Sequence, residues 1–363
     1  MPTENAWFKN ATAYHLLIDR FAGVPAENYA FSDQPVFCGG KLSAIIDRLD
    51  YLQDLGIDTL WLSPFMQSTP NEDAYHGYHV TDYQSVDSRF GTLDDLDALV
   101  QAAYQRGMRV VADFVPNHVH EHCPFFFDWD EKGRHLKPGF EDWFQYKENG
   151  ELSAYFGYGM IPQLNLDHPP ARQYMIESAL FWLSRGIDGL RLDYAAGPSH
   201  DFWQEFSSTI KSHFPASVLI GEVWHEFLFY EHFDQVGLRN RASKVFRERI
   251  DRDELQAEYV GSLDGVLDFS FQSIMVHYFQ TVKKFGESPK LKKALLEALE
   301  EHYAQYPDDF FLVSFLDNHD IDRFLFSVGG QPEFLKQAFE IQMAQQQPAL
   351  IYYGSELGLT NRA

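Results

Sequence analysis

Eight short apolar runs recur along the chain, and segments with the apolar spacing of helices separate them. We interpret each run as a buried strand, because short, β-branched and aromatic-rich stretches bounded by polar residues are typical of parallel sheets. Strands that alternate with helices predict an α/β fold with a parallel sheet, and eight such units favour a closed (β/α)8 TIM barrel over an open sheet. The runs span residues 13–19, 58–65, 108–115, 189–193, 217–223, 265–271, 309–317 and 348–354.

The segments between these runs carry recognisable helix signals. From Lys41 to Leu55 the apolar residues fall on one helical face, and Gly56 follows as a stop signal. Thr92 and Asp95 have the spacing of a capping box, so we expect another helix to begin there. Both segments fit the helices of a barrel.

Two departures from a simple barrel concern the chain's organisation. The stretch at 119–165 between the third and fourth strands is too long for an ordinary loop, so we predict an inserted subdomain over the barrel mouth. The barrel would then comprise residues 1–118 and 166–363. Because the chain stops at Ala363, soon after the eighth strand, we expect the last barrel helix and a C-terminal β-domain to be absent. The apolar surface of that strand would then need cover from a partner or a further segment.

Composition narrows the classes of partner. The chain has 53 acidic and 29 basic residues, for a net charge of −24, which disfavours binding to nucleic acid or anionic membranes. Aromatic residues make up 16 % of the chain and suit stacking on a neutral sugar. We find neither a long apolar span nor a secretory signal, so we expect a cytoplasmic protein. The sequence does not indicate an oligomeric state.

Four polar runs end predicted strands, and they contain the candidate chemistry. These runs are DFVPNH (113–118), LRLDY (190–194), GEVW (221–224) and LDNHD (316–320). Because the carboxyl ends of barrel strands meet at one mouth, Asp193 and Glu222 should lie close together. Two carboxyl groups about 5–5.5 Å apart can cleave a glycosidic bond with retention. Taken singly, each residue has a structural alternative, namely an ion pair or a helix start.

Neighbouring residues favour the catalytic interpretation. Arg191 lies two residues before Asp193, on the same side of the strand, where its guanidinium would keep that carboxylate ionised. Trp224 would partly bury Glu222 and favour the protonated form that a general acid needs. Asp113, inside an apolar run, must be paired, and we interpret it as a buried organiser.

The four runs resemble the conserved regions of the α-amylase family, glycoside hydrolase family 13. The resemblance covers essentially the whole chain and is closest to the cyclomaltodextrinase, neopullulanase and maltogenic amylase group. Starch amylases often have Lys-His where this chain has Ala196 and Gly197, which argues against close kinship with them. Further runs that carry the resemblance are YHLLIDRF, FCGGKL (37–42), HGYHVTDYQSVDSRFGT (76–92), IPQLN (161–165) and IYYGSELGL (351–359).

The resemblance implies a retaining hydrolase of α-glucosidic bonds in α-glucans, malto-oligosaccharides or cyclodextrins. Asp193 would be the nucleophile, Glu222 the acid/base, and Asp320 the third carboxylate that grips the sugar ring. The substrate-binding residues would be Tyr78, His118, Arg191, Trp224, His319 and Arg323.

Other functions use parts of the same pattern. A 4-α-glucanotransferase would employ the same residues with a sugar hydroxyl as acceptor, and a glucan-binding barrel could be inert. A magnesium-dependent barrel enzyme is disfavoured, because the second and sixth strands offer no lysine base. We predict no cofactor and assign no metal site. Asn117 matches a calcium-binding asparagine of many family members, but calcium needs about six to eight oxygens and no other candidate is assignable.

Overall fold

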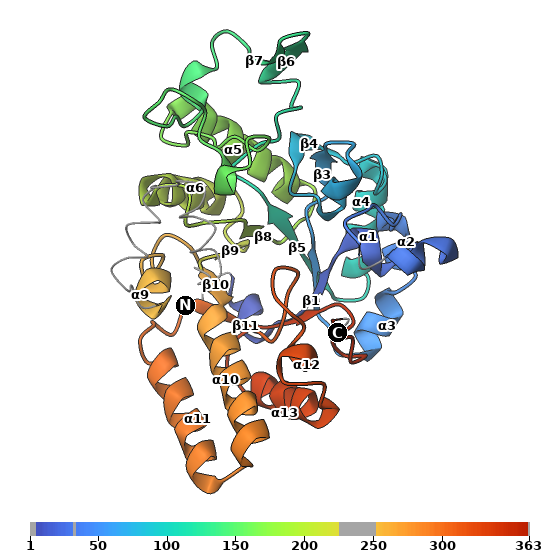
Figure 1. Cartoon of the computed structure of the whole chain (residues 1–363), viewed down its shortest axis with the longest axis vertical. Helices are drawn as coiled ribbons and strands as arrows, with labels where there is room; N and C mark the ends of the chain where they lie inside the picture. The colour runs from blue at the N-terminus through green and yellow to red at the C-terminus, as the bar shows by residue number, and fades with distance from the viewer. Residues whose placement is uncertain (1–4, 32–33, 225–251, 362–363) are drawn as a thin grey trace.

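The computed structural model describes residues 5–31, 34–224 and 252–361 (Figure 1). Eight parallel strands form a closed barrel in which each strand pairs with its neighbours in chain order, and the first pairs with the last. The predicted TIM barrel is therefore confirmed. Its strands are β1 (Thr12–Leu16), β2 (Thr59–Leu62), β5 (Arg109–Phe114), β8 (Gly189–Leu192), β9 (Val218–Gly221), β10 (Gly265–Asp268), β11 (Phe311–Phe315) and β12 (Ala349–Tyr352).

Helices surround the barrel, and α10 and α11 extend from it as an antiparallel pair (Figure 1). The predicted capping box of Thr92 and Asp95 is present at the start of α4. The α-helices are α1 (Ile18–Phe21), α2 (Leu42–Ile46), α3 (Leu49–Asp54), α4 (Leu93–Tyr104), α5 (Pro169–Ser184), α6 (His200–His213), α9 (Arg252–Ala257), α10 (Phe269–Phe285), α11 (Pro289–Tyr303), α12 (Phe324–Ser327) and α13 (Pro332–Met343). Short 3-10 helices are η1 (Ala6–Asn10), η2 (Ala26–Phe31), η3 (Glu72–His76), η4 (Glu141–Trp143) and η5 (Tyr155–Gly157).

The core has two layers, because successive side chains of a strand point to opposite faces. One buried cluster includes Ala13, Trp61 and Val111 from alternate positions of β1, β2 and β5. A larger cluster contains their neighbours, such as Leu60 and Val110, together with the apolar faces of the helices. This arrangement leaves the carboxyl ends of the strands to carry polar side chains.

Each predicted strand differs from the observed one at one or both ends, and the helix predicted over 41–55 differs as well. The run at 265–271 is a strand only to Asp268, whose side chain accepts a hydrogen bond from Phe271 N at 2.8 Å and so caps α10. The first run likewise ends at Leu16, before α1. The helix predicted over 41–55 is divided into α2 and α3, because Arg48 N bonds to Ile45 O in a tight turn between them.

Two antiparallel hairpins lie outside the barrel. β3 (Met66–Ser68) pairs with β4 (Val80–Val86) after the second barrel strand. β6 (Phe127–Asp130) pairs with β7 (Gly133–Leu136) within the stretch at 119–165, at the end of the molecule far from α10 and α11 (Figure 1).

The last strand is better covered than expected. Ile351 on β12 is only 7 % exposed and shares a buried cluster with Ile45 and Leu49 of α2 and α3. The predicted exposure of this strand's apolar side chains is therefore wrong at Ile351. Among residues 5–31, 34–224 and 252–361, no helix combines the length and apolar character needed to cross a bilayer.

Candidate active site

A cavity of about 1310 Å³ opens at the carboxyl ends of the barrel strands. Its wall includes Asp193 after β8, Glu222 after β9 and Asp320 after β11. Asp193 and Glu222 are only 5 % and 4 % exposed, so they reach the cavity from largely buried positions. The structure thus brings the three predicted carboxyl groups to one cavity.

Arg191 joins three carboxylates from neighbouring strands. Its Nη1 donates to Asp113 Oδ1 at 2.7 Å and to Asp193 Oδ1 at 2.9 Å. Its Nη2 lies 2.6 Å from Glu222 Oε1. Because one small planar group contacts both Asp193 and Glu222, these two carboxylates lie close together. Asp113 is fully buried and paired, as expected for an organiser.

Burial and the guanidinium act in opposite directions on these charges. Burial raises the pKa of Asp193 well above its usual value, and Arg191 lowers it by less. Burial likewise raises the pKa of Asp113 to about 7, against the effect of Arg191. The Arg191 guanidinium, which we expected to keep Asp193 ionised, therefore acts against burial, because the carboxyl group is removed from water.

A second polar group lines the same cavity. His319 Nε2 is 3.3 Å from Asp320 Oδ2, and the His319 ring stacks parallel to the Tyr78 ring with centroids 5.2 Å apart. Burial lowers the pKa of His319 to about 3, so this imidazole is neutral near pH 7. The Tyr78 hydroxyl donates to Asp113 Oδ2 at 2.6 Å, which links this group to the Arg191 cluster.

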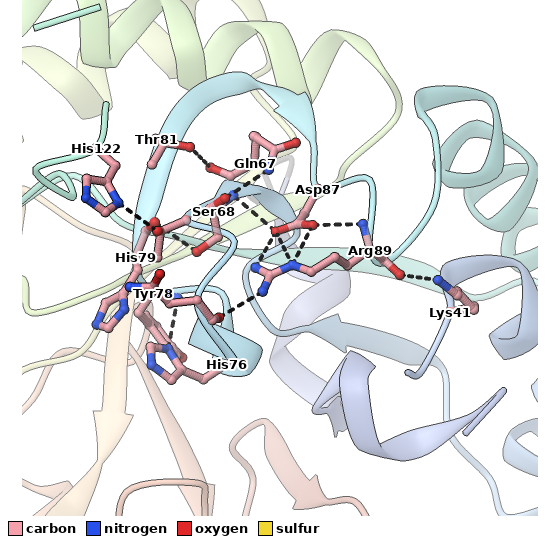
Figure 2. Close-up of polar contacts among 12 residues, drawn as sticks. Lys41, Gln67, Ser68, His76, Tyr78, His79, Thr81, Asp87, Arg89 and His122 are labelled. Carbon is pink, nitrogen blue, oxygen red and sulfur yellow. Dashed lines mark hydrogen bonds and ion pairs between the residues drawn. The ribbon is translucent and has the colours of Figure 1, made fainter. Parts of the chain in front are cut away.

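The β3–β4 hairpin positions Tyr78 (Figure 2). The Tyr78 N–H donates to His76 Nδ1 at 3.0 Å, and His76 is the last residue of η3, two residues before Tyr78. Arg89 ties this turn to the hairpin, since its Nη1 donates to Asn71 O at 3.1 Å while its Nε and Nη2 donate to buried Asp87. Figure 2 shows the contact of Tyr78 with His76 and the contacts of Arg89 with Asp87.

His118 and Asn117 follow β5, and both are buried. His118 Nε2 lies 3.2 Å from the Tyr78 carbonyl oxygen, to which it donates in the neutral tautomer, and its ring stacks on Tyr155 with centroids 4.7 Å apart. Asn117 Oδ1 accepts from Gln163 Nε2 at 3.5 Å. Within the described parts of the chain, no group of three or more His, Cys, Asp or Glu side chains is arranged to hold a metal ion.

The two remaining predicted residues also line the cavity. Trp224 Nε1 donates to Glu222 Oε1 at 3.2 Å, and its ring stacks on Phe269 with centroids 4.6 Å apart. The Arg323 guanidinium lies 4.1 Å from the centroid of the Tyr352 ring. All nine predicted site residues therefore belong to one site.

Three aromatic residues of this site were not predicted from the sequence. Tyr155, Phe156 and Tyr194 line the cavity beside Asp193 and Glu222, and we call them the aromatic wall. The Tyr155 and Tyr194 rings meet with centroids 4.8 Å apart, and the Phe156 and Tyr194 rings with centroids 5.6 Å apart. The sequence signals were the aromatic content of the stretch at 119–165 for Tyr155 and Phe156, and the run LRLDY (190–194) for Tyr194. Neither signal specifies which rings face the cavity.

Comparisons with known proteins agree with this geometry. A family model described as "Alpha amylase, catalytic domain" matches residues 8–158 and 141–363. Alpha-amylase 2 of Dictyoglomus thermophilum is 33 % identical over 97 % of this chain and 56 % of its own length. Neopullulanase 2 of Thermoactinomyces vulgaris is 31 % identical over 98 % of this chain and 58 % of its own length. The chain thus spans little more than half the length of these relatives.

A solved structure shows the same fold. The crystal structure of an Anoxybacillus alpha-amylase matches 98 % of this chain and 72 % of its own chain, with a TM-score of 0.75 and 28 % identity. The match of the family model covers the barrel strands, the stretch at 119–165 and the cavity residues alike. This chain belongs to the α-amylase family.

Proposed function

We propose that the protein is a retaining glycoside hydrolase that cleaves α-glucosidic bonds in α-glucans or malto-oligosaccharides. The observation that carries the proposal is the pairing of Arg191 with both Asp193 and Glu222 at the wall of one cavity. The names of the relatives, an alpha-amylase and a neopullulanase, support the same class of substrate.

The proposed first step forms a covalent intermediate. An oxygen of ionised Asp193 attacks the anomeric carbon while the bond to the leaving sugar oxygen breaks, and the proton of Glu222 moves to that oxygen. Arg191 donates to Asp193 and opposes the effect of burial on its pKa, so it favours the ionised nucleophile. Asp320 and the stacked pair of His319 and Tyr78 would hold the ring.

The second step reverses these roles. Water attacks the same carbon, its proton moves to Glu222, and the bond between that carbon and Asp193 breaks. Two inversions give net retention, so the first product keeps the α configuration. Both steps need only side chains that already lie at this cavity.

Product analysis tests the proposal. The protein is incubated with cyclodextrins, pullulan, soluble starch, maltose and isomaltose, and NMR follows the anomer that forms first. We expect α products from at least one α-glucan, with no products from the Asp193→Asn variant. First-formed β sugar would contradict the retaining mechanism, and an absence of products from all five substrates would contradict the activity itself.

Two finer expectations stay within the proposal. Transfer to a sugar acceptor, the alternative considered above, would give products longer than the substrate in the same experiment. A cytoplasmic location is part of the proposal too, and fractionation of the native cells would test it.

A further inference from the structure

Two residues at the cavity have an unusual backbone conformation. Phe156 has φ 47° and Tyr194 has φ 44°, and among the described residues they are the two positive-φ residues other than glycine. Bulky side chains rarely adopt this left-handed conformation, because Cβ then approaches the following carbonyl oxygen. The two residues also touch each other, with ring centroids 5.6 Å apart. Such strain persists only where the surrounding structure enforces it.

The conformation of Tyr194 changes which atom its N–H reaches. In the parallel ladder of β8 and β9, Glu222 N donates to Leu192 O, so the next donor along β8 should be Tyr194 N to the Glu222 carbonyl. Instead, Ala195 N donates to that carbonyl at 2.9 Å. The Tyr194 N–H is thereby released, and it donates to Glu222 Oε2 at 2.9 Å.

The turn that follows is fixed by buried contacts. The Ala195 carbonyl accepts from Trp203 Nε1 at 2.9 Å and from the Tyr259 hydroxyl at 3.0 Å. Gly197 N donates to the Tyr194 carbonyl at 2.9 Å, and a Cβ on Gly197 would lie 2.2 Å from Asn117 Oδ1. These contacts hold the chain after Tyr194, and before it Asp193 N donates to Phe114 O at 2.9 Å, so the strained conformation is enforced from both sides.

The Glu222 carboxyl group therefore has a hydrogen-bond donor at each oxygen, in addition to the Arg191 guanidinium, whose Nη2 lies 2.6 Å from Oε1. Tyr194 N–H binds Oε2, and Trp224 Nε1 binds Oε1 at 3.2 Å. Two donors on opposite oxygens fix the plane of the carboxyl group and so the direction of any proton that it carries. Only one of these donors, the backbone N–H, depends on a strained conformation.

We propose that Tyr194 is a positioning residue for the acid/base, whose left-handed backbone aims its N–H at Glu222 and so orients the proton that Glu222 gives to the leaving oxygen. This inference rests on the proposed function and goes beyond it. It assigns the role to the Tyr194 backbone, while the Tyr194 ring serves to hold that backbone against Phe156.

The test uses three variants that all lack the ring. Glycine adopts positive φ freely, alanine at a cost, and β-branched valine at a greater cost. For Tyr194→Gly, Tyr194→Ala and Tyr194→Val, kcat/KM is measured on maltotetraose, whose leaving sugar needs a proton, and on α-maltosyl fluoride, whose fluoride leaves with little protonation. On maltotetraose we expect kcat/KM to decrease from the Gly variant to the Ala variant to the Val variant, with the Val variant about 10-fold below the Gly variant. On the fluoride the three variants should be alike.

The same series at Tyr158 is the matched control. Tyr158 also lines the cavity but has φ −73°, so its variants should not follow that order on maltotetraose. Circular dichroism melting checks that each variant is folded, and if Tyr194→Val is not, the comparison of Gly with Ala still decides.

Three outcomes would overturn the inference. Equal kcat/KM of the three Tyr194 variants on maltotetraose would mean that the backbone conformation is irrelevant. A decrease of kcat/KM in the same order on both substrates would mean a merely structural role. The ordered series appearing also at Tyr158 would mean that side-chain size is responsible. A parent protein inactive on both substrates would instead defeat the proposed function, which distinguishes the two failures.

Discussion

The two sides of the Asp193–Glu222 pair are constructed differently. On the polar side, Asp113 and Arg191 lie on the regular strands β5 and β8, Asp193 directly follows β8, and short hydrogen bonds join the three side chains. On the aromatic wall, the residues come from the stretch at 119–165 and from the turn after β8, and two of the three have a left-handed backbone. The strands β5 and β8 thus position the charged side chains, whereas the aromatic wall forms only where the stretch at 119–165 packs against the turn after β8.

This difference has a physical reason. A buried charge needs a partner at a fixed distance, and barrel strands in register hold their side chains with little freedom. An aromatic wall needs only shape and apolar area, so loops can supply it and can vary without disturbing the charges. We therefore expect substitutions on the polar side to affect the chemistry and substitutions in the wall to affect mainly the leaving sugar.

The largest expected effect is on the polar side. Asp193→Asn removes the proposed nucleophile, and we expect kcat to fall at least about 1,000-fold on both maltotetraose and α-maltosyl fluoride. Binding of maltotetraose, measured by isothermal titration calorimetry, should persist because the other ring-binding residues remain. Turnover close to that of the parent would remove Asp193 from the mechanism.

Arg191→Lys should have the next largest effect and should change the pH profile. Arg191 lowers the pKa of Asp193 against burial, and a lysine ammonium cannot both donate to Asp113 and Asp193 and pair with Glu222 as the guanidinium fork does. The pKa of Asp193 then rises, so its ionised form is lost at a higher pH as the solution is acidified. We expect the acid limb of kcat/KM to move to higher pH, with about a 10-fold loss near neutrality.

The pH dependence of kcat/KM for Arg191→Lys is measured from pH 4 to pH 9 on α-maltosyl fluoride. An acid limb at the same pH as in the parent would show that Arg191 does not set the charge of the nucleophile. Lys147→Arg is a suitable control, since Lys147 is in an exposed pair with Glu151.

Tyr155→Ala should distinguish the two sides. Its ring lies between those of His118 and Tyr194, with centroids 4.7 and 4.8 Å away. Loss of stacking area should raise KM for maltotetraose about 3-fold to 10-fold, with a smaller change for α-maltosyl fluoride, which has no leaving sugar. Equal changes on both substrates would mean that the wall supports the polar side and does not contact the leaving sugar.

Asp87→Asn should affect stability more than catalysis. Asp87 is fully buried and pairs with Arg89 at 2.7 Å in the network of Figure 2. Leaving that guanidinium without its charge partner should lower the free energy of unfolding by about 3 kcal/mol, while kcat changes less than about 3-fold. Calorimetry and steady-state kinetics measure the two quantities.

Asp50→Asn is the matched control, because the pair of Asp50 with Arg106 is exposed and should contribute less than about 1 kcal/mol. A large fall in kcat for Asp87→Asn without a loss of stability would show that the hairpin acts on Tyr78 directly.

The polar side could be predicted from sequence because it follows from periodicity. Alternation within a strand places Arg191 and Asp193 on one face, and the common orientation of parallel strands brings Glu222 to the same mouth. The direction in which the pKa of Asp193 is shifted could not be predicted in the same way. Burial at Asp193 outweighs Arg191, and burial depends on everything packed around the site.

The bounds of some elements and the residues of the aromatic wall could not be predicted from the sequence. The strand predicted over 265–271 becomes a helix after Asp268, because that side chain can cap as readily as it can continue a strand. The role of His118 in binding the sugar ring stays a prediction, and the contact of its Nε2 with the Tyr78 carbonyl depends on the β3–β4 hairpin. Neither outcome is visible in a local pattern of residues.

The sequence by itself determined the barrel and the order of its eight strands. The spacing of apolar residues and the polar residues at strand ends are local properties of the chain, and they do not depend on how the side chains pack. It also determined which carboxylates and which arginine would meet. Only the tertiary structure decided that Tyr194 turns left-handed, that its N–H reaches Glu222, and that Tyr155 and Phe156 close the wall beside it. These features depend on contacts between segments far apart in the chain, and such contacts exist only after the barrel has closed.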